Sequence, residues 1–187
     1  MGSLVYSAGC SLDGYINDAD GEFQWSAPTA ETFEFIIGKM RRIRLELYGR
    51  RTYELMTVWE TDPSLAAYGL LELQFAEWWS RTPKIVYSTT LPEEGIITRN
   101  ARLARHFDPA EVRQLKEDTF EDISIFGPTL AAHAFEAGLV DEIELFVLPV
   151  MVGDGTRALP PEVLSLELCE QHRFHDDTIY VRYRVRR

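Results

Sequence analysis

The sequence is poor in cysteine and in positive charge. Two cysteines, Cys10 and Cys169, are too few and too far apart for a disulfide framework or a zinc knuckle, and we interpret both as small hydrophobic residues. Lysine and arginine number 19 against 30 aspartates and glutamates, which gives a formal net charge of -11. Such a chain repels polyanions, so we expect neither nucleic acid nor a membrane surface as a partner.

Long hydrophobic runs are also absent. The longest, Leu145 to Val152, is interrupted by Pro149 and is far shorter than the roughly 20 residues of a membrane-spanning helix. The N-terminus has no basic segment followed by an apolar one, so it does not resemble a signal peptide. These absences predict a cytoplasmic protein.

The overall composition is that of a globular protein. The chain is 45% hydrophobic and 12% aromatic, and neither a linker nor an internal repeat interrupts it. A length of 187 residues is that of one domain, at roughly 100 to 200 residues per domain. We therefore expect residues 1–187 to form a single domain.

Hydrophobic periodicity predicts strands that alternate with helices. The expected strands are Leu4 to Cys10, Ile43 to Tyr48, Lys84 to Ser88, Ile123 to Phe126, Glu142 to Val152, Leu164 to Phe174 and Thr178 to Arg186. The expected helices open at Pro28-Thr29 and Gly127-Pro128-Thr129, or cover Thr52 to Met56, Ser64 to Trp79 and Ala110 to Asp118. In the helix from Ser64 to Trp79, a broad buried face is formed by Leu65, Leu71, Phe75, Trp78 and Trp79.

The order of these elements predicts the fold class. Strands that alternate with helices form a mostly parallel sheet, and the last two expected strands flank Asp176-Asp177 as an antiparallel hairpin. We therefore predict an α/β fold with antiparallel strands at one edge.

Three strand ends carry groups that suit an anionic ligand. After the strand that ends at Gly49, the segment Gly49-Arg50-Arg51-Thr52 offers a glycine, two guanidinium groups and a hydroxyl, which suit a phosphate. The alternative is a glycine turn with two solvated arginines. Ser88-Thr89-Thr90 is either a phosphate or ribose site or a capped polar turn, and Gly127-Pro128-Thr129 opens a helix at the same edge.

Carboxylates near the first loop are candidates for proton transfer. Asp13-Gly14 follows the first strand, Trp25 precedes the first helix, and Glu31 and Glu34 lie in its opening turns. A carboxylate in an apolar pocket beside an aromatic ring has a raised pKa, which suits a proton donor. The alternatives are a common turn pair and carboxylates that favour the positive end of a helix dipole.

Other site types have no support in the sequence. His106 and His133 have no cysteine or carboxylate at ligand spacing, and His172 and His175, three apart in an expected strand, face opposite sides, so we expect no metal site. The chain has neither GxGxxG nor GxxxxGK[ST], which argues against a Rossmann dinucleotide site and a P-loop.

Several segments, in this order, resemble the dihydrofolate reductase-like superfamily. More narrowly, the chain is similar to free-standing relatives of the C-terminal reductase domain of the bifunctional riboflavin-biosynthesis deaminase-reductase. The resemblance spans nearly the whole chain and rests on Ser11-Leu12-Asp13-Gly14-Tyr15-Ile16, Gly49-Arg50-Arg51-Thr52-Tyr53-Glu54, Pro83 to Leu91, Ile125 to Leu130, Gly138 to Glu142 and Pro149 to Gly155.

This resemblance implies a three-layer domain that binds NADPH across the strand ends and passes a hydride to a small heterocyclic substrate, either a pteridine or a ribosylaminopyrimidine. The implied phosphate and ribose contacts are Gly49, Arg50, Arg51, Thr52, Ser88, Thr89, Phe126, Gly127, Pro128 and Thr129, with Arg50 near the 2′-phosphate. Ala8 and Ile16 would line the nicotinamide, and the substrate would meet Asp13, Trp25, Gly153 and Asp154. Asp13 or Glu31 would direct protonation.

Two further expectations concern activity and assembly. Relatives often have two glycines where this chain has Phe126-Gly127, so a reductase-like fold that binds small ligands without turnover is an alternative. The apolar strand from Glu142 to Val152 and the helix near Trp78 and Trp79 favour a homodimer.

Overall fold

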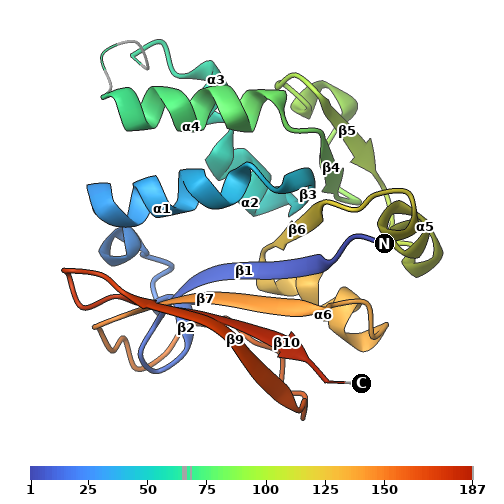
Figure 1. The fold of residues 1–187 in the computed structure, drawn as a ribbon. Coiled ribbons are helices and arrows are strands. Elements are labelled where there is room, and N and C mark those ends of the chain that lie inside the picture. The colour runs from blue at the N-terminus through green and yellow to red at the C-terminus, as the bar shows by residue number, and fades with distance from the viewer. Residues whose placement is uncertain (65–66, 68, 187) are drawn as a thin grey trace.

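The computed structural model describes residues 1–64, 67 and 69–186. Eight strands within this part of the chain form one sheet (Figure 1). The strand order is β5-β4-β3-β6-β1-β7-β10-β9. The strands are β1 Leu4–Ser11, β3 Ile43–Gly49, β4 Lys84–Tyr87, β5 Ala101–Ala104, β6 Asp122–Phe126, β7 Glu142–Leu148, β9 Leu166–Arg173 and β10 Ile179–Val185.

The predicted mixture of strand directions is confirmed. β1 pairs in parallel with both β6 and β7, and β3 pairs in parallel with β4 and β6. β10 is antiparallel to β9, because a short turn joins the two strands as a hairpin, and β10 is also antiparallel to β7. A mostly parallel sheet therefore carries a terminal antiparallel hairpin, as expected from the sequence.

Helices cover both faces of this sheet. α1 and α4 lie on one side of β1 and α6 lies on the other (Figure 1). The helices are α1 Ala30–Met40, α2 Arg50–Met56, α3 Val58–Thr61, α4 Leu70–Arg81, α5 Pro109–Glu117 and α6 Pro128–Glu136. Two of them begin with side-chain caps: Thr29 accepts a hydrogen bond from the Thr32 N–H, and Asp108 accepts one from the Ala110 N–H.

The face covered by α5 and α6 is apolar. Its cluster joins Leu4 and Tyr6 of β1 to Ile125 of β6, with Leu130 and Phe135 of α6 packed on them. Residues of even number on β1 point to this face, as the alternation of side chains along a strand requires. This is the main hydrophobic core of the domain.

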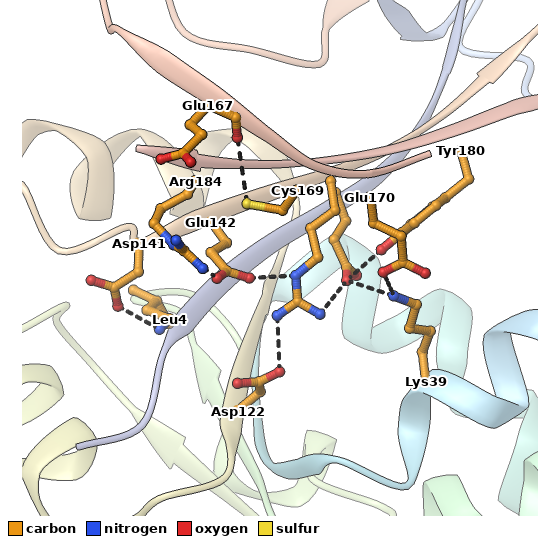
Figure 2. A network of polar contacts seen from close by, with 12 residues as sticks. Leu4, Lys39, Asp122, Asp141, Glu142, Glu167, Cys169, Glu170, Tyr180 and Arg184 are labelled. Atoms are coloured by element: carbon orange, nitrogen blue, oxygen red, sulfur yellow. Dashed lines mark hydrogen bonds and ion pairs between the residues drawn. The ribbon is translucent and has the colours of Figure 1, made fainter. Parts of the chain in front are cut away.

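The opposite face carries a network of charged side chains beneath α1 (Figure 2). Arg182 of β10 forms ion pairs with Glu142 and Glu144 of β7 and with Asp122 of β6. Lys39 of α1 lies 2.5 Å from Glu170 and 3.7 Å from Glu144. Each charged group of this network thus has a partner of opposite sign, which offsets its loss of hydration.

Two of the predicted elements need correction. The helix expected from Ser64 begins at Leu70, Leu65 lies outside the described residues, and Trp78 is 38% exposed rather than buried. The strand expected from Glu142 to Val152 ends at Leu148, because Pro149 has no N–H for the sheet ladder. The sequence reading missed the short elements α3, β5, β2 Tyr15–Asn17 and β8 Thr156–Arg157.

Candidate active site

The carboxyl ends of the parallel strands bring the predicted site segments to one edge of the sheet. Gly49 of β3 lies in register with Tyr87 of β4, and Ser11 of β1 lies in register with Leu148 of β7. Within each of these two pairs, the loops that follow the strands therefore begin at the same level, and β1 and β7 extend a few residues beyond the end of β6. An edge of this kind is where open α/β sheets bind ligands.

We call the loops after β3, β4 and β6 the cofactor half of this edge, defined by residues 49–52, 88–90 and 127–129. Two of these loops are in close contact at Gly127, whose φ is +88°. A Cβ atom added there would lie 2.9 Å from the Thr52 Oγ1, so a larger residue would be strained and also crowded. The structure thus brings together Thr52 and Gly127, which are 75 positions apart in the sequence.

Arg50 connects the loops after β3 and β4. Its Nε donates a hydrogen bond of 2.8 Å to Glu54, and its Nη1 donates one of 3.1 Å to the Thr90 hydroxyl. The Arg50 side chain remains 44% exposed, so its guanidinium is accessible from solvent. Arg51, also implied as a phosphate contact, is exposed on the next position of α2.

The Ser88 hydroxyl caps the turn after β4. It accepts hydrogen bonds from the N–H groups of Thr90 and Leu91, at 3.2 and 2.9 Å. Thr89 is exposed beside it. The turn is therefore capped by its own serine, and its threonine side chains remain exposed.

Phe126 lies on the opposite side of the backbone from the α6 cluster. Its ring stacks on Tyr48 with centroids 5.0 Å apart and an interplanar angle of 13°. The ring also packs against a cluster that includes Tyr53 and Val86. The half-buried Phe126 side chain is thus accommodated by packing against these residues.

The helices α2 and α6 begin at this edge without a side-chain cap. Gly49 and Gly127 occupy their N-cap positions, and no described side chain accepts a hydrogen bond there from the first turn. By contrast, Thr29 caps α1 and Asp108 caps α5. The nine-residue helix α6 therefore keeps open N–H groups and the positive end of its dipole at the edge, with Pro128 and Thr129 in its first turn.

We call residues 11–17, 25, 31 and 150–157 the substrate half of the same edge. The Asp13 carboxylate accepts hydrogen bonds from the backbone N–H groups of Val152 and Gly153, at 3.2 and 2.8 Å. A hydrogen bond from the Ser11 hydroxyl is the largest cause of the lowered pKa of Asp13. Asp154 is exposed and accepts a bond from the N–H of Gly155.

A second connection joins the same two segments. β2 pairs with β8 as a small antiparallel sheet, and the Asn17 Oδ1 accepts a bond of 2.8 Å from the Thr156 N–H. The backbones of the two segments are in close contact here, because a Cβ atom added to Gly155 would lie 2.0 Å from the backbone carbonyl oxygen of Asn17. Ile16 lies within β2, between these contacts.

Glu31 lies at the start of α1 and binds the hairpin turn between β9 and β10. Its carboxylate accepts a hydrogen bond of 2.9 Å from the His175 N–H and lies 2.8 Å from the His175 Nδ1. The backbone bond from His175 is the largest cause of the lowered pKa of Glu31. The carboxylate thus binds within the chain, at a contact that the sequence did not indicate.

The expectation of a raised carboxyl pKa at this edge is wrong for both Asp13 and Glu31. Each side chain accepts hydrogen bonds from backbone N–H groups, which favour the ionised form and lower the pKa. Trp25 lies in a short 3-10 helix, Gln24–Ser26, and its Nε1 donates to the Glu22 carbonyl. Ala8 is partly buried against the cluster on the α6 face.

Sequence reasoning assigned no role to three polar residues that shape this edge. Ser11, Asn17 and His175 each bond a predicted site residue or the loop that carries one. Asn17 and His175 bind partners more than 130 positions away, and no local pattern signals such a bond.

In the described part of the chain, no helix has both the length and the apolar character needed to cross a bilayer.

Sequence comparison identifies the family. The family model of the RibD C-terminal domain matches residues 3–180. The chain is 27% identical over 158 residues to the uncharacterized protein YyaP of Bacillus subtilis, covering 81% of this chain and 77% of that protein. It is 26% identical over 164 residues to the riboflavin biosynthesis protein RibD of Mycobacterium tuberculosis, covering 83% of this chain and 44% of RibD. The chain thus spans less than half the length of that relative.

Solved structures show the same fold. A putative riboflavin biosynthesis protein from Shewanella sp. PV-4 superposes with a TM-score of 0.74 at 22% identity, over 99% of both chains. Acinetobacter baumannii RibD superposes with a TM-score of 0.68 at 18% identity, over 100% of this chain and 59% of that one. Together with the family match, these findings confirm the resemblance seen in the motifs. The chain belongs to the RibD C-terminal domain family, the reductase-domain family of riboflavin biosynthesis.

Proposed function

We propose that this protein is an NADPH-dependent reductase that transfers a hydride to a small heterocyclic substrate, either a pteridine or a ribosylaminopyrimidine. The observation that carries the proposal is the open start of α6 at the cofactor half. Gly127 leaves the first-turn N–H groups without a side-chain cap, beside Thr52 and near the carboxyl end of β3. Such a helix start favours a phosphate group.

The residues of the cofactor half fit the phosphates of NADPH. Thr52, Thr129 and the α6 N–H groups suit the pyrophosphate, and the exposed Arg50 guanidinium beside Thr90 suits the 2′-phosphate. Ser88 and Thr89 lie next to that position, which suits the adenosine ribose. When bound, NADPH supplies the hydride, and the chain contributes binding and orientation.

The substrate half would form one side of the binding site for the substrate that accepts the hydride. Asp13, Gly153 and Asp154 belong to two segments held together by backbone hydrogen bonds, with Ile16 and Trp25 on neighbouring elements. Catalysis in such a site comes mainly from holding the acceptor beside the nicotinamide with the reacting atoms aligned.

The second candidate is a reductase-like protein that binds a nucleotide or a heterocycle without turnover. The lowered pKa of Asp13 and Glu31 favours this candidate, because neither carboxyl group holds a proton at neutral pH. Both candidates bind a ligand at the same edge. Turnover distinguishes them.

Titration with NADPH, followed by nicotinamide fluorescence, tests cofactor binding directly. We expect saturable binding at micromolar to low-millimolar NADPH, and its absence at millimolar concentration would contradict both the reductase and a nucleotide-binding module. NADPH oxidation is then followed with 5-amino-6-(5-phosphoribosylamino)uracil and with dihydrofolate as acceptors. Steady oxidation with either acceptor rejects the inactive module, and binding without turnover of any acceptor tested favours it.

A further inference from the structure

The Asp13 side chain bridges two segments that are far apart in the sequence. It extends from the turn after β1. Its Oδ1 accepts a hydrogen bond from the Val152 N–H, and its Oδ2 accepts one from the N–H of the next residue, Gly153. The loop that carries these N–H groups follows β7 and precedes β8. Both carboxylate oxygens are thus already engaged by the protein.

Ser11 extends this bridge into the interior. Its hydroxyl oxygen is buried and accepts a bond of 3.0 Å from the Tyr15 N–H. The Ser11 hydroxyl also favours the ionised form of Asp13 and is the largest cause of the lowered pKa of that carboxyl group. Both oxygens of the carboxylate accept backbone N–H donors, which is the arrangement expected of an ionised acceptor.

We propose that Asp13 is a positioning residue, which fixes residues 150–155 as a wall of the substrate half, and that it is not the proton donor of the reaction. The role in a reaction rests on the proposed function, whereas the bridge itself is tested without turnover. A proton donor needs a free protonated oxygen near the substrate at working pH. Asp13 has an ionised carboxylate whose oxygens accept bonds from its own chain.

The remaining contacts between the two segments make the expected effect local. The Leu12 N–H donates to the Val150 carbonyl, the Ala158 N–H donates to the Gly14 carbonyl, and Asn17 binds Thr156. These bonds do not involve the Asp13 side chain. Removal of its carboxylate should therefore loosen Val152 and Gly153 without unfolding the domain.

Amide hydrogen exchange in a graded series of variants tests the bridge. Asp13→Ala removes both acceptor oxygens, Asp13→Asn keeps one, and Asp20→Asn is the matched control, since Asp20 is exposed in the next loop. In Asp13→Ala we expect the Val152 and Gly153 amides to exchange about tenfold faster, with a smaller increase in Asp13→Asn and none in the control. Unchanged exchange of both amides in folded Asp13→Ala or Asp13→Asn would overturn the bridge.

Kinetics of Asp13→Asn then separate positioning from proton transfer, with 5-amino-6-(5-phosphoribosylamino)uracil as the acceptor. For a positioning residue we expect a higher KM for the acceptor, an unchanged Kd for NADPH and a kcat that keeps its pH profile. A fall in kcat of about a hundredfold with loss of one limb of the pH profile would identify a proton donor and overturn the proposal. If wild-type protein turns over neither this acceptor nor dihydrofolate, the proposed reaction is wrong and hydrogen exchange alone decides the bridge.

Discussion

The two halves of the strand edge treat their backbone N–H groups in opposite ways. In the cofactor half, α2 and α6 begin at Gly49 and Gly127 without a described side chain that caps them. In the substrate half, the chain supplies its own acceptors, because Asp13 binds Val152 and Gly153 and Asn17 binds Thr156. Within the cofactor half, the starts of α2 and α6 are thus left open to an anion while Ser88 caps its own turn, whereas these loops of the substrate half are closed by the protein itself.

This difference indicates where charge is expected in a bound ligand. Open N–H groups at a helix start attract phosphate, whereas N–H groups that already bind a carboxylate offer it nothing. Under the proposed function, the phosphates of NADPH would bind beside Thr52 and Gly127, and the substrate half would select its ligand mainly by shape. The following changes break or sharpen this division.

The largest effect is expected at Gly127. Gly127→Ala places a Cβ at a φ of +88° and 2.9 Å from the Thr52 Oγ1, which disturbs the cofactor half at its closest contact. We expect a loss of stability of about 1–2 kcal/mol from the backbone strain alone, and a fall of more than about tenfold in affinity for NADPH.

Chemical denaturation and fluorescence titration measure these two effects. Gly38→Ala is the control, because Gly38 lies within α1 where an added Cβ meets nothing within 4 Å, and alanine there should stabilise the helix by up to about 1 kcal/mol. Undiminished affinity in Gly127→Ala would place the phosphates elsewhere.

A smaller and more selective effect is expected at Arg50. Arg50→Ala removes the guanidinium that connects Glu54 and Thr90, so we expect affinity for NADPH to fall by about tenfold and affinity for NADH to change little. Fluorescence titration with both nucleotides provides the comparison, and Arg113→Ala, on the exposed face of α5, is the charge-matched control. Equal losses for NADPH and NADH would show that Arg50 does not contact the 2′-phosphate.

The smallest effect is a pH dependence confined to the substrate half. The pKa values of Asp13 and Glu31 are lowered by hydrogen bonds within the chain, so the stability from these bonds is fully present above the ordinary carboxyl pKa of about 4. It is lost as the pH falls below that value and the carboxylates take up protons. The N–H resonance of Gly153 should therefore shift with a midpoint below the ordinary pKa of an aspartate.

The Thr90 amide is the internal control for this titration. It donates to the Ser88 hydroxyl, which does not ionise, so its resonance should stay constant over the same range. A Gly153 midpoint above the ordinary carboxyl pKa would mean that Asp13 is not held by these bonds.

Much of the fold and of the cofactor half could be predicted from local patterns. The apolar spacing of Phe33, Ile37 and Met40 predicts α1, and glycines after strands mark the loops at 49 and 127. Because parallel strands align their carboxyl ends, those loops are brought together once the sheet is predicted. Long periodic elements and strand ends are thus readable from the sequence.

Contacts between distant segments could not be predicted in this way. The bond from His175 to Glu31 and the bridge from Asp13 to Gly153 depend on tertiary structure, and both reverse the pKa shift that the local sequence suggested. The short strands β5 and β8 were missed because four and two residues show too little periodicity. The start of α4 was placed too early, because apolar residues before Leu70 continue the helical spacing.

Amide hydrogen exchange with and without saturating NADPH tests the division of the edge most directly. We predict that NADPH protects amides in residues 49–54 and 127–131, which contain the first turns of α2 and α6, and in residues 88–91, the turn after β4. The Val152 and Gly153 amides should change little. Protection confined to residues 11–17 and 150–157 would contradict the account, because it would place the cofactor on the half that the protein has already closed.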